Sequence, residues 1–238
     1  MRFPVRAEAS WAHGLAFILS IVAGSTDIIG FLGLNGLFTS HITGNIVVLA
    51  AHMVVGDPTV FSYILSVPVF MLVLLLTRLL AAALERAGLS TLNPLLLLQL
   101  LFLVAFLVLG VTAGPWKDAD AALAILAGML GVAAMAVQNA LVQISLKNSA
   151  TTAVMTTNVT HFMLDLAEVL VGRDQDEIAK ARRSVMRTLP VIVGFVLGCA
   201  LGAACEAIAG LWSLALPAGL ALVACALGFK PVYDARTP

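Results

Sequence analysis

Long uncharged apolar runs constrain this chain more than any other feature of its sequence. Residues 94–112 contain no charged side chain and a single amide, Gln99, and residues 188–205 and 210–229 contain no charge at all. A helix that spans a bilayer needs about 20 such residues. Only 11% of the residues are charged, whereas a soluble domain carries roughly 25%. The sequence therefore predicts an all-α membrane protein rather than a soluble domain.

The apolar sequence divides into eight hydrophobic segments joined mostly by short connections. We expect six to eight of these segments to span the membrane, because 36–56 and 152–172 either cross it or re-enter it from one side. The eight segments lie near 12–34, 36–56, 59–84, 93–113, 120–143, 152–172, 188–209 and 212–229.

The placement of Lys and Arg predicts the orientation of the chain. With eight spans and a cytoplasmic N-terminus, three of the 13 basic residues, Arg78, Arg86 and Lys147, fall outside and the other ten fall in the cytoplasm. Positively charged loops remain on the cytoplasmic side of a membrane. We therefore expect both termini in the cytoplasm, although six spans with two re-entrant segments would change some of these assignments.

The chain contains two similar blocks in its two halves. Residues 39–47 align with residues 152–160 at an offset of 113, close to half the chain length. This similarity predicts a first transmembrane repeat at 1–116 and a second at 117–238, and the alternative is chance similarity between apolar sequences. Four segments in each half would bring both copies in from the same side, so we expect a parallel repeat about an axis along the membrane normal.

The same blocks carry a family resemblance. Residues 24–27 (Gly-Ser-Thr-Asp), 38–41 (Phe-Thr-Ser-His) and 43–45 (Thr-Gly-Asn), with 138–140 (Gln-Asn-Ala) in the second half, are similar to the YoaK-like family of bacterial integral membrane proteins. Where a second Thr-Gly-Asn is expected, this chain has Thr-Thr-Asn at 156–158. The resemblance covers nearly the whole chain. It implies a helical protein of the bacterial plasma (inner) membrane but names no substrate, because the family is largely uncharacterised.

Two polar breaks interrupt the apolar pattern, at residues 39–45 and 151–158. Thr and Asn favour helix N-termini, where free N–H groups and the positive end of the helix dipole suit an anion or a polar solute. The alternative is ordinary helix caps at the membrane surface. A shared polar cavity touching both breaks and Asp27 would favour a binding site. The residues predicted to bind substrate are Asp27, Thr39, His41, Thr43, Gly44, Asn45, Asn139, Thr156 and Asn158.

Ionisable side chains inside apolar segments are candidates for proton transfer. A carboxylate at the bilayer centre costs about 2.5–3.5 kcal/mol on insertion scales, so Asp27 needs either a function or neighbouring hydroxyls that satisfy it. His161 and Asp165 share one helix face, and the offset of 113 pairs His52 with Asp165. We predict Asp27, His52, His161 and Asp165 as a proton relay, with solvation at the cytoplasmic end as the alternative for Asp165.

These features favour a transporter or channel for a small polar solute or ion, either coupled to protons or not, with its site between the two repeats. A scaffold or sensor that transports nothing is the alternative. An intramembrane enzyme is less favoured, because the chain has four histidines and no His-Glu-x-x-His or Gly-x-Ser-x-Gly motif. We expect no cofactor, no bound metal and no nucleic-acid partner; the lipid bilayer is the expected surrounding. Gly194, Gly198 and Gly202 form a small-residue ladder that predicts close helix packing, within the chain or in a homo-oligomer.

Overall fold

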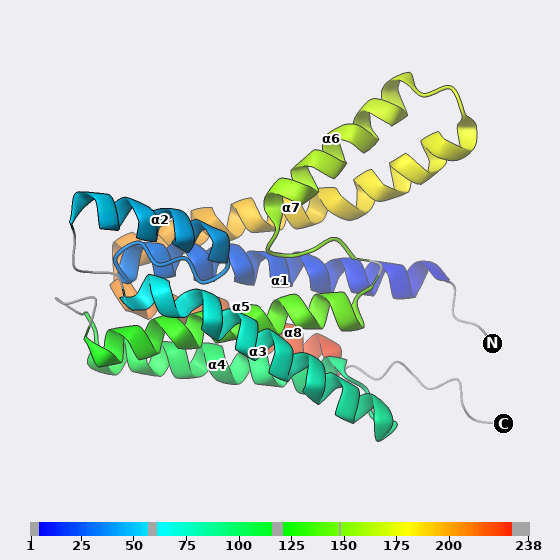
Figure 1. Cartoon of the computed structure of the whole chain (residues 1–238). Helices are drawn as coiled ribbons and strands as arrows, with labels where there is room; N and C mark the ends of the chain where they lie inside the picture. The colour runs from blue at the N-terminus through cyan, green and yellow to red at the C-terminus, as the bar shows by residue number, and fades with distance from the viewer. Residues whose placement is uncertain (1–4, 57–60, 116–120, 148, 230–238) are drawn as a thin grey trace.

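A computed structural model describes residues 5–56, 61–115, 121–147 and 149–229, with side chains from residue 11 onward. The described residues form eight α-helices and one 3-10 helix, and they contain no β-strand (Figure 1). The predicted all-α class is confirmed. The elements are α1 (Val5–Gly33), α2 (Ile42–Val55), α3 (Phe61–Arg86), α4 (Leu92–Ala113), α5 (Ala122–Ser145), α6 (Met155–Val171), α7 (Gln175–Ala209), η1 (Gly210–Leu214) and α8 (Ala215–Gly228).

Five stretches of the described chain are long and apolar enough to cross a membrane. Four of them lie in α1, α3, α4 and α5, and the fifth, Gln175–Gly228, contains both α7 and α8. The chain turns between these two helices at Gly210, whose φ of 55° lies in the left-handed region that favours glycine. α7 and α8 then run in opposite directions in Figure 1, so the five stretches contain six helices that cross the bundle.

The helices α1 and α5 lie antiparallel in the core of the bundle. Leu15, near the start of α1, shares an apolar cluster with Leu141, near the end of α5. Ile29, near the end of α1, shares another cluster with Ala127, near the start of α5. Figure 1 shows the two helices running in opposite directions. The expected parallel relation of the two halves is therefore corrected to an inverted one.

The short helix α2 explains this inversion, because it enters and leaves the bundle on one side. After α1 ends, residues 34–41 run back beside its last turns, and the backbone N–H of Ser40 reaches Asp27. At the other end of α2, the ring of His52 stacks on Tyr63 at the start of α3, with 5.2 Å between ring centroids. The hydroxyl of Tyr63 donates to the carbonyl of Asn35, just after α1. The first half thus crosses the bundle three times, and an odd number of crossings inverts the second half.

The second half repeats this path with α5, α6 and α7. Residues 149–154 run back beside α5, and Thr152 accepts a hydrogen bond from Gln138, seven residues before the end of that helix. α6 then runs back toward the side of the molecule where α5 finished, but it points away from the bundle, and α7 begins beyond its outer end (Figure 1). α6 and the first half of α7 project from the bundle as a helical hairpin. Neither 36–56 nor 152–172 therefore crosses the bundle completely, as expected for segments that re-enter from one side.

Small residues allow α1 and α7 to approach closely along their length. A Cβ atom added to Gly198 would lie 2.4 Å from the carbonyl oxygen of Ile21, and one added to Gly194 would lie 2.9 Å from that of Phe17. Gly202 is likewise in contact with α1. The small-residue ladder is therefore buried between helices of one chain, and it does not present a surface to a second copy.

The helix contacts follow the same order in both halves. α1 packs on α7 as α5 packs on α3, α4 packs on α5 as α8 packs on α1, and α2 packs on α3 as α6 packs on α7. If each helix of α1–α4 is replaced by its counterpart in α5–α8 and the reverse, the contact α1–α7 becomes α5–α3, and the other two pairs of contacts interchange in the same way. An internal repeat requires this correspondence. The division into two repeats stays a prediction, and its boundary between 116 and 117 lies outside the described residues.

Candidate functional site

Asp27 lies at the centre of the first break and holds the returning segment against α1. The residue as a whole is 4% exposed. Oδ1 accepts the backbone N–H of Ser40 at 2.7 Å and, over longer distances of 3.4 Å each, the hydroxyl of Thr39 and the backbone N–H of His41. Backbone amides that have left a helix need an acceptor when they are buried, and Asp27 supplies one.

The second oxygen of Asp27 is paired with the imidazole of His41. His41 Nδ1 lies 2.5 Å from Asp27 Oδ2. The side chain of His41 is 40% exposed while that of Asp27 is 5% exposed, so the imidazole is the accessible member of the pair. A short contact of this kind lets one proton be shared between a buried carboxylate and a group that faces outward.

The Asp27–His41 pair lies in the wall of a cavity of about 500 Å³ between α2 and α7. Most of the wall is apolar, and the pair is its ionisable part. The ring of Phe195 meets that of His41 edge-on, with 5.5 Å between centroids. The first turn of α2 also lines the cavity, which brings the positive end of that helix toward it. The lining residues are Asp27, Ile28, Phe38, His41, Thr43, Gly44, Val47, Phe195 and Cys199.

Asn45 stabilises the first break without reaching the cavity. Its fully buried side chain accepts the backbone N–H of Phe38 at 2.9 Å and donates to the carbonyl of Phe38 at 2.7 Å. Asn158 binds the residue seven positions before it in the same way: it donates to the carbonyl of Thr151 at 2.6 Å and accepts the Thr151 hydroxyl at 3.2 Å. Both asparagines therefore fold the backbone that precedes a half-length helix.

A network of neutral amides occupies the second break, where the first has an acid and an imidazole. Gln138 Nε2 donates to Thr152 Oγ1 at 2.8 Å and to the carbonyl of Leu19 at 2.8 Å. Gln99 Nε2 donates to Gln138 Oε1 at 2.7 Å. Both glutamines are fully buried. This network holds the second returning segment in place and contributes no side chain to the cavity at the first break.

The structure brings five of the predicted substrate-binding residues together around the cavity and its Asp27, and the other four do not reach the cavity. Asp27, Thr39, His41, Thr43 and Gly44 gather at the first break. Asn139 donates to the carbonyl of Met135 in its own helix, Thr156 is exposed at the start of α6, and Asn45 and Asn158 bind backbone. The cavity therefore touches Asp27 but neither asparagine.

The predicted relay residues are similarly divided. His52 stacks on Tyr63 near the end of α2, whereas His161 and Asp165 lie on the projecting helix α6. His161 is exposed and Asp165 is half-buried there. Only Asp27 of the four lines the cavity.

Sequence reasoning missed the contribution of α7 to this site. Phe195 and Cys199 stand opposite α2, and Cys199 Sγ lies 3.5 Å from the carbonyl oxygen of Gly24. Both residues fall within an uncharged run and have no polar neighbour in sequence to distinguish them from lipid-facing positions. Phe38 was part of the recognised motif, but its contribution to the wall is also a matter of tertiary structure.

A comparison with protein families covers most of the chain. The model of a family described as "Protein of unknown function (DUF1275)" matches residues 15–227. The chain belongs to this family. The YoaK-like family is DUF1275, so the resemblance read from the two breaks is confirmed. No curated protein and no solved structure matches the chain significantly. The DUF1275 match omits the start of α1 and the last residue of α8 and covers the other helices completely. It therefore includes both breaks.

The chemistry of this DUF1275 member at the first break is that of an ionisable pair. Among the residues that the structure describes, no group of three or more His, Cys, Asp or Glu side chains is placed to hold a metal ion. A carboxylate and an imidazole are groups that can exchange a proton, and the cavity beside Asp27 and His41 has room for a small molecule. This arrangement can couple protonation to the occupancy of the cavity.

Proposed function

We propose that this DUF1275 protein is a transporter or channel for a small polar solute or ion, coupled to protons through Asp27 and His41. One observation carries the proposal: a buried carboxylate holds a broken helix in place and shares a short contact with an imidazole that faces a cavity of about 500 Å³. Ionisable residues within a membrane protein are costly and usually serve an ion or proton path.

The inverted arrangement of the helices supports this reading. Many transporters combine two inverted halves with discontinuous helices whose free ends face the substrate. Here α2 begins beside Asp27, and its first turn lines the cavity. Protonation of the Asp27–His41 pair changes the charge beside that helix terminus, so the affinity for a polar solute changes with it.

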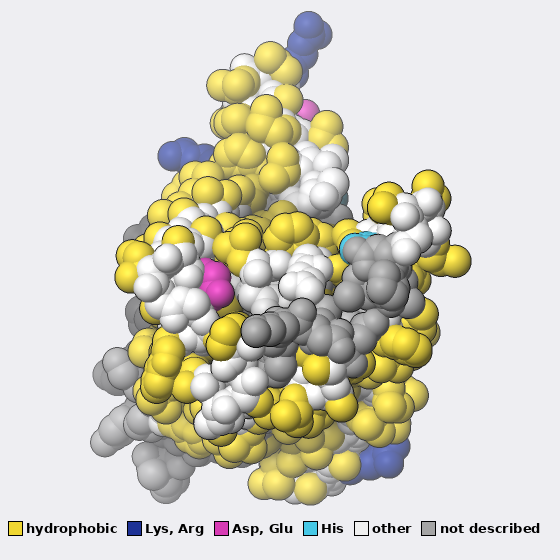
Figure 2. Space-filling view, turned by 90° about the vertical axis from the view of Figure 1, so that its left-hand side faces the viewer, with side chains coloured by type: hydrophobic (Ala, Val, Ile, Leu, Met, Phe, Trp, Pro, Cys, Tyr) yellow, Lys and Arg dark blue, Asp and Glu magenta, His cyan; other side chains and the backbone are white. Residues whose placement is uncertain are grey.

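The distribution of charge supports a cytoplasmic position for both termini in a bacterial inner membrane. The basic side chains that the structure describes lie in the half of the bundle nearest the start of α1: two on α3, one after α5, one after α6 and four on the first part of α7. Figure 2 looks onto the opposite end, where most coloured side chains are hydrophobic and the blue of Lys and Arg appears only at the edges of the view. By the positive-inside rule, the basic end faces the cytoplasm. Arg78, Arg86 and Lys147, which a topology of eight spans would place outside, then lie at the cytoplasmic end with the other described basic residues.

Flux in liposomes tests the proposal. Purified protein is reconstituted with a pH-sensitive dye inside the vesicles, and a panel of ions and small metabolites is applied with and without a proton gradient. We expect proton movement to accompany the flux of at least one solute. Asp27→Asn should lower this proton-coupled flux at least about tenfold, because a positioned acid–base group accelerates proton transfer by about 10²-fold or more.

A matched variant separates loss of coupling from loss of structure. Asp165→Asn makes the same chemical change on α6, away from the cavity, and is expected to keep the flux. Size-exclusion chromatography checks that both variants remain folded. Normal proton-coupled flux in Asp27→Asn would exclude the coupling role, and the absence of flux for the whole panel would favour the scaffold or sensor instead.

A further inference from the structure

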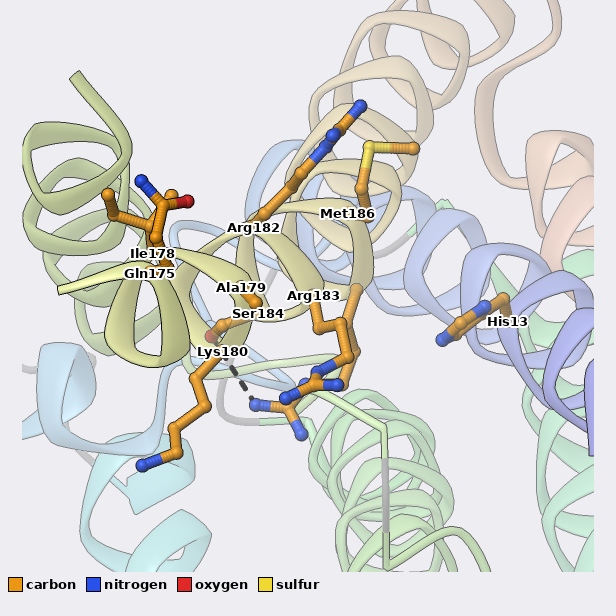
Figure 3. A pocket seen from close by; sticks show the side chains of 10 residues that line it. His13, Gln175, Ile178, Ala179, Lys180, Arg182, Arg183, Ser184 and Met186 are labelled. Carbon is orange, nitrogen blue, oxygen red and sulfur yellow. Dashed lines mark hydrogen bonds between the residues drawn. The ribbon is translucent and has the colours of Figure 1, made fainter.

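A second cavity, of about 860 Å³, lies at the basic end of the bundle, between the start of α1 and the first part of α7. Its basic residues come from α7, with His13 of α1 on the other side (Figure 3). Lys180, Arg183 and Arg187 recur at intervals of three and four residues, which places them on one face of α7. In Figure 3, Lys180 and Arg183 project to one side of the helix. This cavity is distinct from the one beside Asp27.

The guanidinium of Arg187 has an unused donor in this cavity. Its Nη2 donates to the hydroxyl of Ser184 at 3.4 Å. Its Nε is buried and has no hydrogen-bond partner within the described part of the chain. A buried donor without an acceptor costs free energy that a bound anion would recover. Lys180 is already paired with Glu177 at 2.6 Å, so the unmatched charge of the lining is that of Arg182, Arg183 and Arg187. Arg182 projects to the opposite side of α7 from Lys180 and Arg183 in Figure 3, which leaves Arg183 and Arg187 on the face that carries Lys180.

The surface that continues from the cavity is apolar. Met186 lines the cavity and is 63% exposed, and Leu189 and Val193 follow it along α7 at 40% and 42% exposure. A ligand that fits both the basic cavity and this apolar row of side chains has a phosphate group that binds the arginines and hydrocarbon chains that contact Met186, Leu189 and Val193. Basic pockets beside transmembrane helices on the cytoplasmic side bind anionic lipid headgroups in this way.

We propose that the cavity formed by His13, Lys180, Arg183 and Arg187 binds the phosphate headgroup of an anionic phospholipid, whose acyl chains lie along Met186, Leu189 and Val193. A lipid bound there joins α1 to the projecting α6–α7 hairpin. The site is independent of the Asp27 cavity, and its test does not depend on transport.

Binding of short-chain lipids to the detergent-solubilised protein tests this site. The protein is titrated by calorimetry with dioctanoyl phosphatidylglycerol and, separately, with dioctanoyl phosphatidylcholine, which has the same chains and a zwitterionic headgroup. We expect phosphatidylglycerol to bind at least about tenfold more tightly. Arg183→Gln and Arg187→Gln should each weaken its binding about fivefold, the factor expected for one basic residue near an anionic lipid.

Arg86→Gln is the matched control, because it removes one positive charge from the same end of the bundle but outside the cavity. We expect it to bind both lipids as the unchanged protein does. If Arg187→Gln does not fold, the exposed Arg183→Gln still decides the result. Equal binding of the two lipids, or unchanged phosphatidylglycerol binding in Arg183→Gln, would overturn the proposal. Competition by inorganic phosphate at concentrations equal to the lipid would also overturn it, since the site would then serve free phosphate.

Discussion

The two breaks have similar backbones but different side-chain chemistry. In each, a returning segment runs back beside a crossing helix, and an asparagine binds the backbone seven residues before it. At the first break the polar centre is Asp27 with His41, and a cavity opens beside them. At the second break the centre is Gln138, a neutral amide with neutral partners.

This difference separates the structural role of a break from its chemical role. Either kind of polar group satisfies the backbone of a discontinuous helix, so the fold alone does not require an acid. An ionisable pair costs more to bury than an amide network does. Among the described residues such a pair lies at the first break and not at the second, which is the reason to place the proposed proton coupling at the first break.

The largest expected effect on stability is that of Asp27→Leu, which removes the polar centre of the first break. The backbone N–H of Ser40 and the imidazole of His41 would lose their acceptor inside the protein. Breaking a buried pair by removing one partner costs about 3–5 kcal/mol, and we expect a loss of this size. The free energy of unfolding in an SDS titration measures it, with Asp165→Leu on α6 as the control. A loss below about 1 kcal/mol would mean that the carboxylate does not hold the break.

Matched substitutions of the two asparagines sharpen the comparison. Asn45→Ala leaves both backbone groups of Phe38 without their partner, and Asn158→Ala leaves one backbone carbonyl, that of Thr151. An unsatisfied buried group costs about 1–3 kcal/mol. We therefore expect about 2–3 kcal/mol for Asn45→Ala and about 1–2 kcal/mol for Asn158→Ala in the same titration. The reverse order would show that Asn158 at the second break contributes more to the free energy of unfolding than Asn45 does.

The smallest effect is expected for Gln99→Leu in the amide network. This change removes one hydrogen bond to Gln138, but it also removes Oε1 of Gln99, a buried acceptor with no partner among the described side chains and backbone. These two contributions oppose each other, and we expect a change within about 1 kcal/mol. Thermal unfolding followed by tryptophan fluorescence is the measurement. A loss of stability above about 2 kcal/mol would show that the amide network depends on Gln99 and itself stabilises the fold.

Much of the fold follows from local patterns. Uncharged runs of membrane length predict helices wherever they occur, because a backbone in lipid must satisfy its own hydrogen bonds. The same reasoning located both breaks, since Thr and Asn compete with helical hydrogen bonds. It also identified Asp27 as an acid that needs either a function or neighbouring hydroxyls, and the structure places the hydroxyl of Thr39 3.4 Å from its carboxylate.

The direction of the halves was not predictable in the same way. Hydrophobicity shows that 36–56 is apolar, but it does not show whether the chain leaves on the far side or turns back. The answer depends on contacts between residues distant in sequence, such as Tyr63 with Asn35. The parallel arrangement failed for this reason. The same limitation hid Phe195 and Cys199, whose position opposite α2 is set by the packing of α7 on α1.

The amino-acid sequence by itself determined that this chain is a helical membrane protein with two polar interruptions, because composition and hydrogen-bonding preferences act over a few neighbouring residues. Only the tertiary structure decided that α2 and α6 turn back, that the halves are inverted, and that His41 meets Asp27 beside a cavity. Those outcomes depend on which helices approach one another, and close approach is governed by side chains from separate parts of the chain, such as Gly198 against Ile21.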